Sequence, residues 1–445
     1  MPETQHRWPR LRRLCGHGRR AASVLVLAAM LAAPLSPLVP GLSPAADAAP
    51  AGDAGDWIGT WVASPQPLWS GEFPLPTLAP PTLWKQTIRQ VAGISLGGKR
   101  VRVVLSNEYG ARPLTIGAAH VAVAGNGAAT VGGTDRTLTF NGRPAVTIPP
   151  GAPVVSDPVD LAVEPFANLA VSLFLPEPTA VETFHWDGRQ TASIVAGNHV
   201  ADADFKPDAT TSTRAFLTGI LVDAPAGARA IVTLGDSITD GNGSTPDSNR
   251  RWPDFLARRM AGGTAPAAVL NAGISGARVL KDRMGEKAAA RLARDVFSQP
   301  HVEAVIVMMG INDIAWPGTV FAPNDPPTTA EEVITGYQQL IARARAQGVR
   351  IIGATLTPFQ DALQGTPIEG YYSPEKDKVR QAVNGWIRSS GAFDAVLDFD
   401  ALVRDPGNAV RFLPAMDSGD HLHPGDTGYK AMADSIDLSL LARKR

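Results

Sequence analysis

The chain has 445 residues, of which 44% are hydrophobic and 19% are charged, and its formal net charge is −1. This balance is typical of a globular protein that buries a sizeable core, and the length predicts two or three domains. Without excess positive charge the chain has no reason to bind nucleic acid, and a single cysteine, Cys15, excludes an intramolecular disulfide framework.

The first segment, residues 1–48, has the order of parts that is typical of a secretory signal peptide. Six arginines come first, the apolar run from Ala21 to Ala33 follows, and a stretch rich in Pro and Ala ends at Ala48. The apolar run is too short to span a bilayer, so a membrane anchor is the weaker interpretation. We therefore expect a secreted protein, extracellular or periplasmic, with no stable membrane insertion after cleavage.

Cleavage after residue 48 would also change the chemistry of the mature chain. The segment holds six arginines and two acidic residues, so its removal changes the formal net charge from −1 to −5. It also removes Cys15, which leaves no thiol and no cysteine nucleophile. The remaining histidines are mostly scattered singly, so we expect neither a metal site nor a cofactor.

Residues 57–223 have the pattern of short antiparallel strands. Lys99–Leu105 and Asn168–Leu175 alternate along their length, and turn sequences such as Asn141–Pro144 and Pro149–Gly151 separate runs of this kind. Long helical periodicity is lacking. We predict a β-sandwich that forms an accessory domain over residues 57–223.

After Ala224-Pro225-Ala226-Gly227 the pattern changes to strand, polar loop and helix, over a second domain of residues 228–445. The expected strands are Ala230–Leu234, Ala268–Asn271, Ala304–Met309, Val349–Leu356 and Ala395–Phe399. The expected helices are Asp254–Met260, Leu280–Phe297, Ala330–Ala346, Pro374–Ser389 and Thr427–Ala442. Because the strands are continuous apolar runs, we predict a parallel, doubly wound α/β sheet that is buried on both faces.

Polar groups follow three of these strands at their C-terminal ends, where parallel sheets gather their active groups. Ser237 lies in the block Gly235-Asp236-Ser237, Gly273 ends the block Asn271-Ala272-Gly273, and Asn312 lies in Gly310-Ile311-Asn312-Asp313. A serine at the end of a buried strand can be a nucleophile. We therefore expect these three residues to lie together in one site.

A fourth block, Asp420-His421-Leu422-His423-Pro424, supplies the groups that activate a serine. A serine hydroxyl becomes a good nucleophile only when a base takes its proton, and an imidazole with a pKa of about 6.5 can do so at neutral pH. His423 is the candidate base. Asp420, three residues earlier, could hold the other ring nitrogen and stabilise the imidazolium.

In this order the four blocks resemble those of the GDSL/SGNH hydrolase family, over residues 230–445. The resemblance implies a three-layer, flavodoxin-like SGNH domain and ester hydrolysis through an acyl-enzyme on Ser237, with Asp420 and His423 completing the catalytic set. It also implies three donors to the oxyanion, which are the backbone N–H groups of Ser237 and Gly273 and the side-chain amide of Asn312.

Two further segments, Asp398-Phe399-Asp400 and Leu413–Asp420, resemble the secreted branch of this family that includes acetylxylan-esterase-like enzymes. That branch often carries a β-sandwich ahead of the hydrolase, which implies an acylated polysaccharide or another carbohydrate ester as substrate. Lipases, thioesterases and arylesterases use the same catalytic set, so small or lipid esters are the alternative. A glycoside hydrolase and a non-catalytic carbohydrate-binding protein are more remote alternatives. The oligomeric state stays open.

Several residues near the four blocks have a second interpretation. His421 occupies a spacer position, and Asp417 is better explained as a loop residue that binds local backbone. Asp236 and Asp313 could be the two carboxylates of a glycoside hydrolase or metal ligands, but we expect them to brace their loops by hydrogen bonds.

Aromatic residues are also open to two interpretations. Three tryptophans of the first domain could form a sugar-stacking platform, although a place in the core is favoured; they are Trp69, Trp84 and Trp186. Three residues after the third block could equally form a pocket wall or pack in the core; they are Trp316, Pro317 and Phe321.

Overall fold

The structure is a computed structural model that describes residues 55–69, 73–223, 226–261 and 266–441. The predicted signal peptide, residues 1–48, lies outside the described residues.

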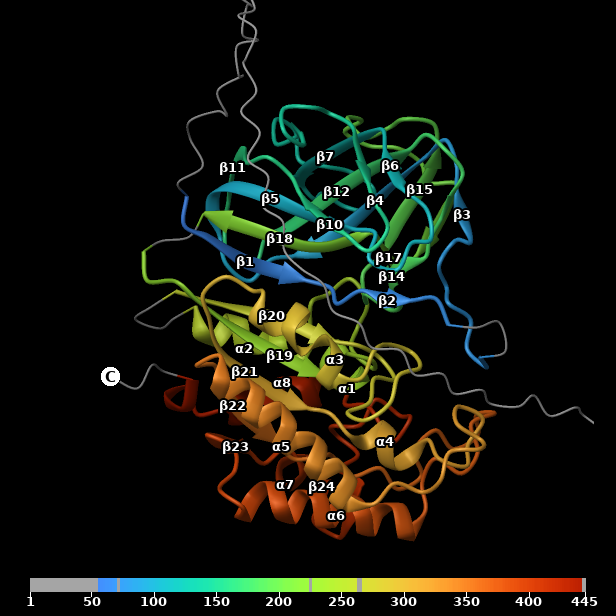
Figure 1. Ribbon diagram of the computed structural model, residues 1–445, viewed down its shortest axis with the longest axis vertical. Helices are drawn as coiled ribbons and strands as arrows, with labels where there is room; N and C mark the ends of the chain where they lie inside the picture. The colour runs from blue at the N-terminus through green and yellow to red at the C-terminus, as the bar shows by residue number, and fades with distance from the viewer. Residues whose placement is uncertain (1–54, 70–72, 224–225, 262–265, 442–445) are drawn as a thin grey trace, which may run out of the picture. The chain divides into compact units, whose positions relative to one another are not determined.

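The C-terminal part of the chain contains a five-stranded parallel sheet in the order β20-β19-β21-β22-β23 (Figure 1). Its strands are β19 Arg229–Gly235, β20 Ala267–Gly273, β21 Val302–Met308, β22 Arg350–Ala354 and β23 Ala395–Leu397. Strand β19 pairs with β20 on one side and with β21 on the other, so the strand order reverses at β19. In doubly wound proteins such a reversal creates a crevice outside the carboxyl ends of the strands, where ligands bind.

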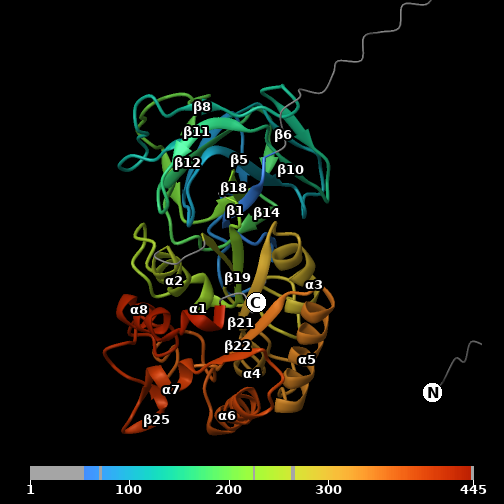
Figure 2. The same ribbon diagram turned by 90° about the vertical axis from the view of Figure 1, so that its left-hand side faces the viewer.

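Helices cover both faces of this sheet, and Figure 2 shows α3 and α5 on one side with α2 and α8 on the other. Alternate residues of β19 face two separate cores: Val232 packs in the core of α3, α5 and α6, whereas Ile231 packs in the core of α2, α7 and α8. The helices are α1 Ser237–Asp240, α2 Trp252–Met260, α3 Ala288–Leu292, α4 Ile311–Ala315, α5 Ala330–Ala346, α6 Pro374–Ser389, α7 Phe399–Val403 and α8 Asp426–Ser435. The predicted doubly wound α/β fold is confirmed.

The helix expected over Leu280–Phe297 is wrong in its first half. Helix α3 begins at Ala288 and continues as the π-helix η1, Ala293–Phe297. The preceding residues are held in a loop because the carboxylate of Asp313 accepts the backbone N–H groups of Val279 (2.7 Å) and Leu280 (2.9 Å). These bonds compete with the helical pattern.

The last helix also ends earlier than expected. Helix α8 stops at Ser435, and Ile436 has an extended backbone with φ −71° and ψ 118°. The short 3-10 helix η2, Leu438–Leu441, follows it.

The N-terminal part contains two antiparallel sheets and shorter strand pairs. One sheet has the order β1-β18-β5-β10, with β11 also paired to β5; its strands are β1 Trp57–Val62, β5 Gly98–Ser106, β10 Pro153–Val155, β11 Val159–Val163 and β18 Leu217–Asp223. The other has the order β16-β15-β4-β12-β7-β8; its strands are β4 Gln86–Gly93, β7 Ala118–Val123, β8 Arg136–Thr137, β12 Asn168–Leu175, β15 Ala192–Ala196 and β16 Ala209–Thr211.

Both antiparallel sheets contribute to one apolar core. Val101 and Val103 of β5 and Ile88 and Leu173 of the other sheet belong to the same cluster of buried side chains. This arrangement is consistent with the predicted β-sandwich. A small three-stranded sheet has the order β17-β14-β2, with β2 Gln66–Pro67, β14 Thr183–His185 and β17 Arg214–Ala215. The shorter pairs of this part are β3 Thr82–Leu83 with β13 Thr179–Ala180 and β6 Leu114–Ile116 with β9 Val146–Ile148. In the C-terminal part, β24 Arg404–Asp405 pairs with β25 Asn408–Phe412.

The N-terminal sheets contact the edge of the parallel sheet. Strand β1 lies beside β20 in Figure 1, and the backbone N–H of Val269 in β20 donates to Ser95 Oγ at 3.2 Å. Residues Gly52–Arg445 form a single compact unit. The division into domains of residues 57–223 and 228–445 therefore stays a prediction. Within the described ranges, no helix has both the length and the apolar character needed to cross a membrane.

Candidate active site

Three strand ends place the first candidate groups. Strand β19 ends at Gly235, and Asp236 caps helix α1 by accepting the Ile238 N–H at 3.1 Å, so that Ser237 is the first residue of the helix. Strand β20 ends at Gly273, and Asn312 lies in α4 just after β21. The three residues expected together thus follow three adjacent strands, at the point where the strand order reverses.

Ser237, His423 and Asp420 form a continuous line of hydrogen bonds. His423 Nε2 lies 2.8 Å from Ser237 Oγ, and His423 Nδ1 lies 2.6 Å from Asp420 Oδ2. Ser237 and His423 are almost wholly buried, with exposed fractions of 6% and 7%. In this geometry the imidazole can take the hydroxyl proton while the carboxylate stabilises the charge that forms.

Asp420 is held as a carboxylate by the residues around it. Its Oδ1 accepts the backbone N–H groups of His423 (2.8 Å) and Leu422 (3.0 Å) and the hydroxyl of Ser418 (3.1 Å). Burial alone would raise the pKa of Asp420, but the hydrogen bond and the charge of His423 lower this pKa well below its usual range. Asp420 therefore stays ionised at any pH at which His423 can act as a base.

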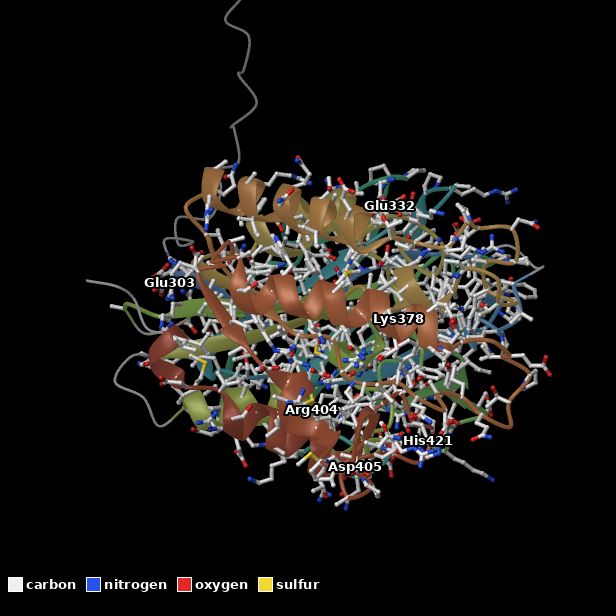
Figure 3. The ribbon with its side chains drawn as sticks, turned by 90° about the horizontal axis from the view of Figure 1, so that it is seen from below. Glu303, Glu332, Lys378, Arg404, Asp405 and His421 are labelled. Atoms are coloured by element: carbon white, nitrogen blue, oxygen red, sulfur yellow. The ribbon has the colours of Figure 1, made fainter. Side chains whose placement is uncertain are left out.

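The second histidine of this block does not reach the serine. His421 Nδ1 pairs with Asp417 Oδ2 at 2.5 Å, and its side chain is 39% exposed. Figure 3 labels His421 near the lower edge of the molecule in that view. Asp417 also accepts the backbone N–H groups of Gly419 (2.8 Å) and His421 (3.1 Å), as expected for a residue that braces its loop. Residues 417–423 thus contain two His–Asp pairs, and only His423 lies against Ser237.

The three oxyanion donors implied by the family resemblance differ in whether their N–H groups already donate to an acceptor within the protein. The N–H of Ser237 lies in the first turn of α1, where backbone N–H groups have no helical acceptor. The N–H of Gly273 donates to Asn271 Oδ1 at 2.9 Å, so this donor is engaged within the protein. The amide of Asn312 donates one Nδ2 proton to the carbonyl of Ala277 at 3.1 Å, which leaves its second proton.

Glycine is required at position 273 because the backbone there meets helix α1. A Cβ at this position would lie 2.3 Å from the backbone N of Asp240, which is closer than real Cβ contacts. The end of β20 can approach the Ser237 helix only because residue 273 has no side chain.

A buried arginine holds these strand ends together. Arg291 of α3 donates to the carbonyl oxygens of Ala272 (2.7 Å) and Gly235 (2.9 Å), which directly precede Gly273 and Asp236. Its charge is balanced by Asp295 at 2.7 Å. The sequence motifs did not point to Arg291, because it lies outside the four blocks, within the segment that was expected to be one long helix.

Asp236 and Asp313 brace their loops, as expected. Both are buried, and burial raises the pKa of Asp236 to about 7 and that of Asp313 to about 6. Each accepts backbone N–H groups, from Ile238 for Asp236 and from Val279 and Leu280 for Asp313. In the part of the chain that the structure describes, no group of three or more His, Cys, Asp or Glu side chains could hold a metal ion.

The tryptophans of the N-terminal part have different environments. Trp69 is buried in the core, Trp186 is half-buried, and Trp84 is 55% exposed. Trp316 and Phe321 are also buried; their rings stack at 4.8 Å, and Phe73 of the N-terminal part stacks on Phe321 at 5.5 Å. Trp316 and Phe321 therefore pack in the core.

A buried ion pair that the sequence did not predict lies behind the serine helix. Asp240, the last residue of α1, pairs with His185 Nε2 of β14 at 2.9 Å, and its other oxygen accepts the Ser275 N–H (3.0 Å) and hydroxyl (2.6 Å). His185 Nδ1 lies 3.0 Å from the carbonyl oxygen of Ser64. Because both ring nitrogens face acceptors, the surroundings favour the imidazole with two protons and a positive charge. The motif Gly235–Gly241 contains Asp240, but no local signal connects it to His185.

This pair predicts a pH dependence of stability. Burial alone would lower the pKa of His185, but the charge and hydrogen bond of Asp240 raise it above its usual value. A raised native pKa means that the contribution is complete below the unfolded value of about 6.5 and is lost as the pH rises through the native pKa. We expect His185→Gln to remove this loss of stability above about pH 6.5.

Urea unfolding at several pH values between about 5 and 9 measures the effect. His199→Gln is the matched control, because His199 pairs with Asp202 at 2.7 Å on the surface, with a side chain 36% exposed. An unchanged pH profile in His185→Gln, or an equal change in His199→Gln, would contradict the assignment.

The similarities to known proteins concern the C-terminal part of the chain. Residues 233–431 match the model of the GDSL-like Lipase/Acylhydrolase family. Solved structures similar to the chain include an acetyl xylan esterase, with 20% identity over 46% of this chain and 96% of that chain and a TM-score of 0.34. A carbohydrate acetylesterase from Sinorhizobium meliloti has 18% identity over 46% and 94% of the two chains, with a TM-score of 0.35. The native aryl esterase of M. smegmatis has 17% identity over 46% and 95%, with a TM-score of 0.36. Comparison with curated proteins found no match.

Proposed function

We propose that this ester hydrolase cleaves carboxylic esters through a covalent acyl-enzyme on Ser237. The proposal starts from the match of residues 233–431 to the model of the GDSL-like lipase/acylhydrolase family. The observation that carries the proposal is the line of hydrogen bonds from Asp420 through His423 to Ser237. Its parts are those that acyl transfer to a serine needs, in the order in which they act.

The chemistry follows from this order. His423 Nε2 takes the proton of Ser237 as Oγ bonds to the ester carbonyl carbon, and the carbonyl electrons move to the oxygen. The imidazolium, stabilised by Asp420, then gives its proton to the leaving alkoxide as the C–O bond breaks. In the second half, His423 takes a proton from a water molecule as the water oxygen bonds to the acyl carbon. The bond from this carbon to Ser237 Oγ then breaks, His423 returns the proton to Oγ, and the acid is released.

The oxyanion formed in each addition needs donors that are already in place. We propose that the N–H of Ser237 and the free amide proton of Asn312 point at it. We propose that Gly273 joins them when its N–H turns from Asn271 Oδ1 to the oxyanion or is shared between the two acceptors.

Loss of the Asn312 amide is expected to slow the chemical step with little effect on ground-state binding. Removing one such donor typically costs about 10²- to 10³-fold in kcat. Steady-state kinetics of Asn312→Ala on a small activated acetate ester measure it. Asn408→Ala is the control, because Asn408 lies on β25 and its Nδ2 donates to Gln360 Oε1 at 2.9 Å. A large rise in KM with unchanged kcat would instead make Asn312 a substrate-binding group.

We propose that the natural substrates are acetylated polysaccharides or other carbohydrate esters met outside the cell. The support is the signal-peptide pattern of residues 1–48, the predicted β-sandwich of residues 57–223, and the resemblance of Asp398–Asp400 and Leu413–Asp420 to the secreted acetylxylan-esterase-like branch. Mass spectrometry of the mature N-terminus recovered from culture medium tests the secretion.

A panel of substrates tests the specificity. Acetate release from acetylated xylan is compared with hydrolysis of activated esters of acetate, butyrate, octanoate and palmitate, with Ser237→Ala as the blank. The proposal expects acetyl esters and the acetylated polymer to have the highest kcat/KM. Preference for octanoate or palmitate would favour a lipase, and preference for small aryl acetates without activity on the polymer would favour an arylesterase.

A further inference from the structure

We propose that Tyr371 is a positioning residue of the oxyanion hole, which holds the Asn312 amide so that its free proton faces the reacting carbonyl. The inference rests on the proposed function. It adds a residue that lies outside the four sequence blocks, in the connection between β22 and α6.

The orientation of the Asn312 amide is defined from both ends. The hydroxyl of Tyr371 donates to Asn312 Oδ1 at 2.8 Å, and Asn312 Nδ2 donates to the carbonyl oxygen of Ala277 at 3.1 Å. A backbone carbonyl can only accept, so the nitrogen must lie on the Ala277 side and the oxygen on the Tyr371 side. With the oxygen and one amide proton engaged, a single N–H is left to donate.

Both partners are buried, which makes their hydrogen bond stronger and its loss more costly. Tyr371 and Asn312 each have an exposed fraction of 2%. Burial raises the pKa of Tyr371 well above its usual value, so the hydroxyl keeps its proton throughout the range in which a histidine base operates. The hydroxyl is therefore able to donate to Asn312 Oδ1 over this whole pH range.

The segment that carries Tyr371 is itself tied to the helix that carries Asn312. The ammonium group of Lys376 donates to the carbonyl oxygens of Gly370 and of Ala315 in α4, each at 2.6 Å. One bridge thus holds the residue before Tyr371 against α4. The phenol ring of Tyr371 packs edge-on against Phe359 at 6.3 Å, a contact that a phenylalanine would keep.

Without the Tyr371 hydroxyl the amide can rotate or turn over, and a turned amide would present its oxygen to the oxyanion. We expect Tyr371→Phe to lower kcat by roughly tenfold to a hundredfold, less than complete loss of the Asn312 donor, with KM little changed. The reason is that the variant disorders a donor without removing it.

The decisive experiment is a double-mutant cycle with Asn312→Ala, using kcat and KM for a small activated acetate ester. If Tyr371 acts through Asn312, the effect of Tyr371→Phe disappears in the Asn312→Ala background. An equal loss in both backgrounds, or no loss in the single variant, overturns the proposal. Tyr372→Phe is the matched control, because its ring also packs against Phe359, at 5.2 Å, and we expect its kcat to match that of the wild type.

Two further measurements keep the test independent of folding and of the proposed function. Thermal melting shows whether Tyr371→Phe is folded. If Tyr371→Phe does not fold, Lys376→Met is used in its place, because it loosens the segment that carries Tyr371. In its cycle with Asn312→Ala, a loss of kcat that disappears in the Asn312→Ala background supports the proposal, and an equal loss in both backgrounds overturns it. Full activity of Ser237→Ala would refute the proposed function itself, whereas an inactive Ser237→Ala beside a fully active Tyr371→Phe refutes only the role of Tyr371.

Discussion

Ser237→Ala is expected to lower kcat by about 10⁴- to 10⁶-fold, because the variant removes the atom that forms the acyl-enzyme and leaves only binding and the oxyanion donors. Its KM should change little, since the hydroxyl is small and the surrounding donors stay in place. Steady-state kinetics on an activated acetate ester, with single-turnover measurements to isolate the acylation step, give the value. The retained fold is checked by thermal melting.

Covalent labelling makes this prediction specific to one residue. A serine-directed phosphonate should add to Ser237 alone, and peptide mapping by mass spectrometry locates the label. Ser248→Ala is the control, because Ser248 lies in the loop after α1, donates to the carbonyl oxygen of Pro246 at 3.1 Å and has no histidine partner. A label on another serine, or full activity in Ser237→Ala, would refute the acyl-enzyme at this residue.

Elements whose ends carry strong local signals were predicted well from the sequence. Helix α5 has the expected bounds because Thr329 and Glu332 form a capping box, and α6 has them because Ser373 caps it and Pro374 occupies its first turn. The strands of the parallel sheet were equally readable, because burial on both faces makes them continuous apolar runs. Three of the strand ends then located Ser237, Gly273 and Asn312.

Features that depend on distant contacts were not predictable. The loop before α3 exists because Asp313, more than thirty positions away, takes the N–H groups of Val279 and Leu280. The His185–Asp240 pair and the Tyr371–Asn312 bond join residues 55 and 59 positions apart. Periodicity and turn chemistry describe neighbours along the chain, so they carry no information about such pairs.

His423→Asn is expected to lower kcat on the order of 10³-fold or more, because no base then takes the proton of Ser237. His421→Asn should keep most of the activity, since its ring pairs with Asp417 and not with the serine. Asparagine is the suitable replacement for both, because His421 has a φ of 61°, a conformation that asparagine tolerates better than most residues.

The two His–Asp pairs within residues 417–423 allow a test in which each variant has its own control. Asp420→Asn should also reduce kcat strongly, because the asparagine amide can donate to His423 Nδ1. The proton of the neutral imidazole would then lie on Nε2, which faces Ser237 and could no longer accept the hydroxyl proton. In a serine protease triad the same Asp→Asn change lowers kcat by about 10⁴-fold. Asp417→Asn should weaken only its loop. We therefore expect a lower melting temperature and a kcat close to that of the wild type. If kcat fell in His421→Asn and Asp417→Asn but not in His423→Asn and Asp420→Asn, the base would be His421 and the loop would have to rearrange in solution. Because His423 Nε2 already lies 2.8 Å from Ser237 Oγ, the geometry requires no such rearrangement.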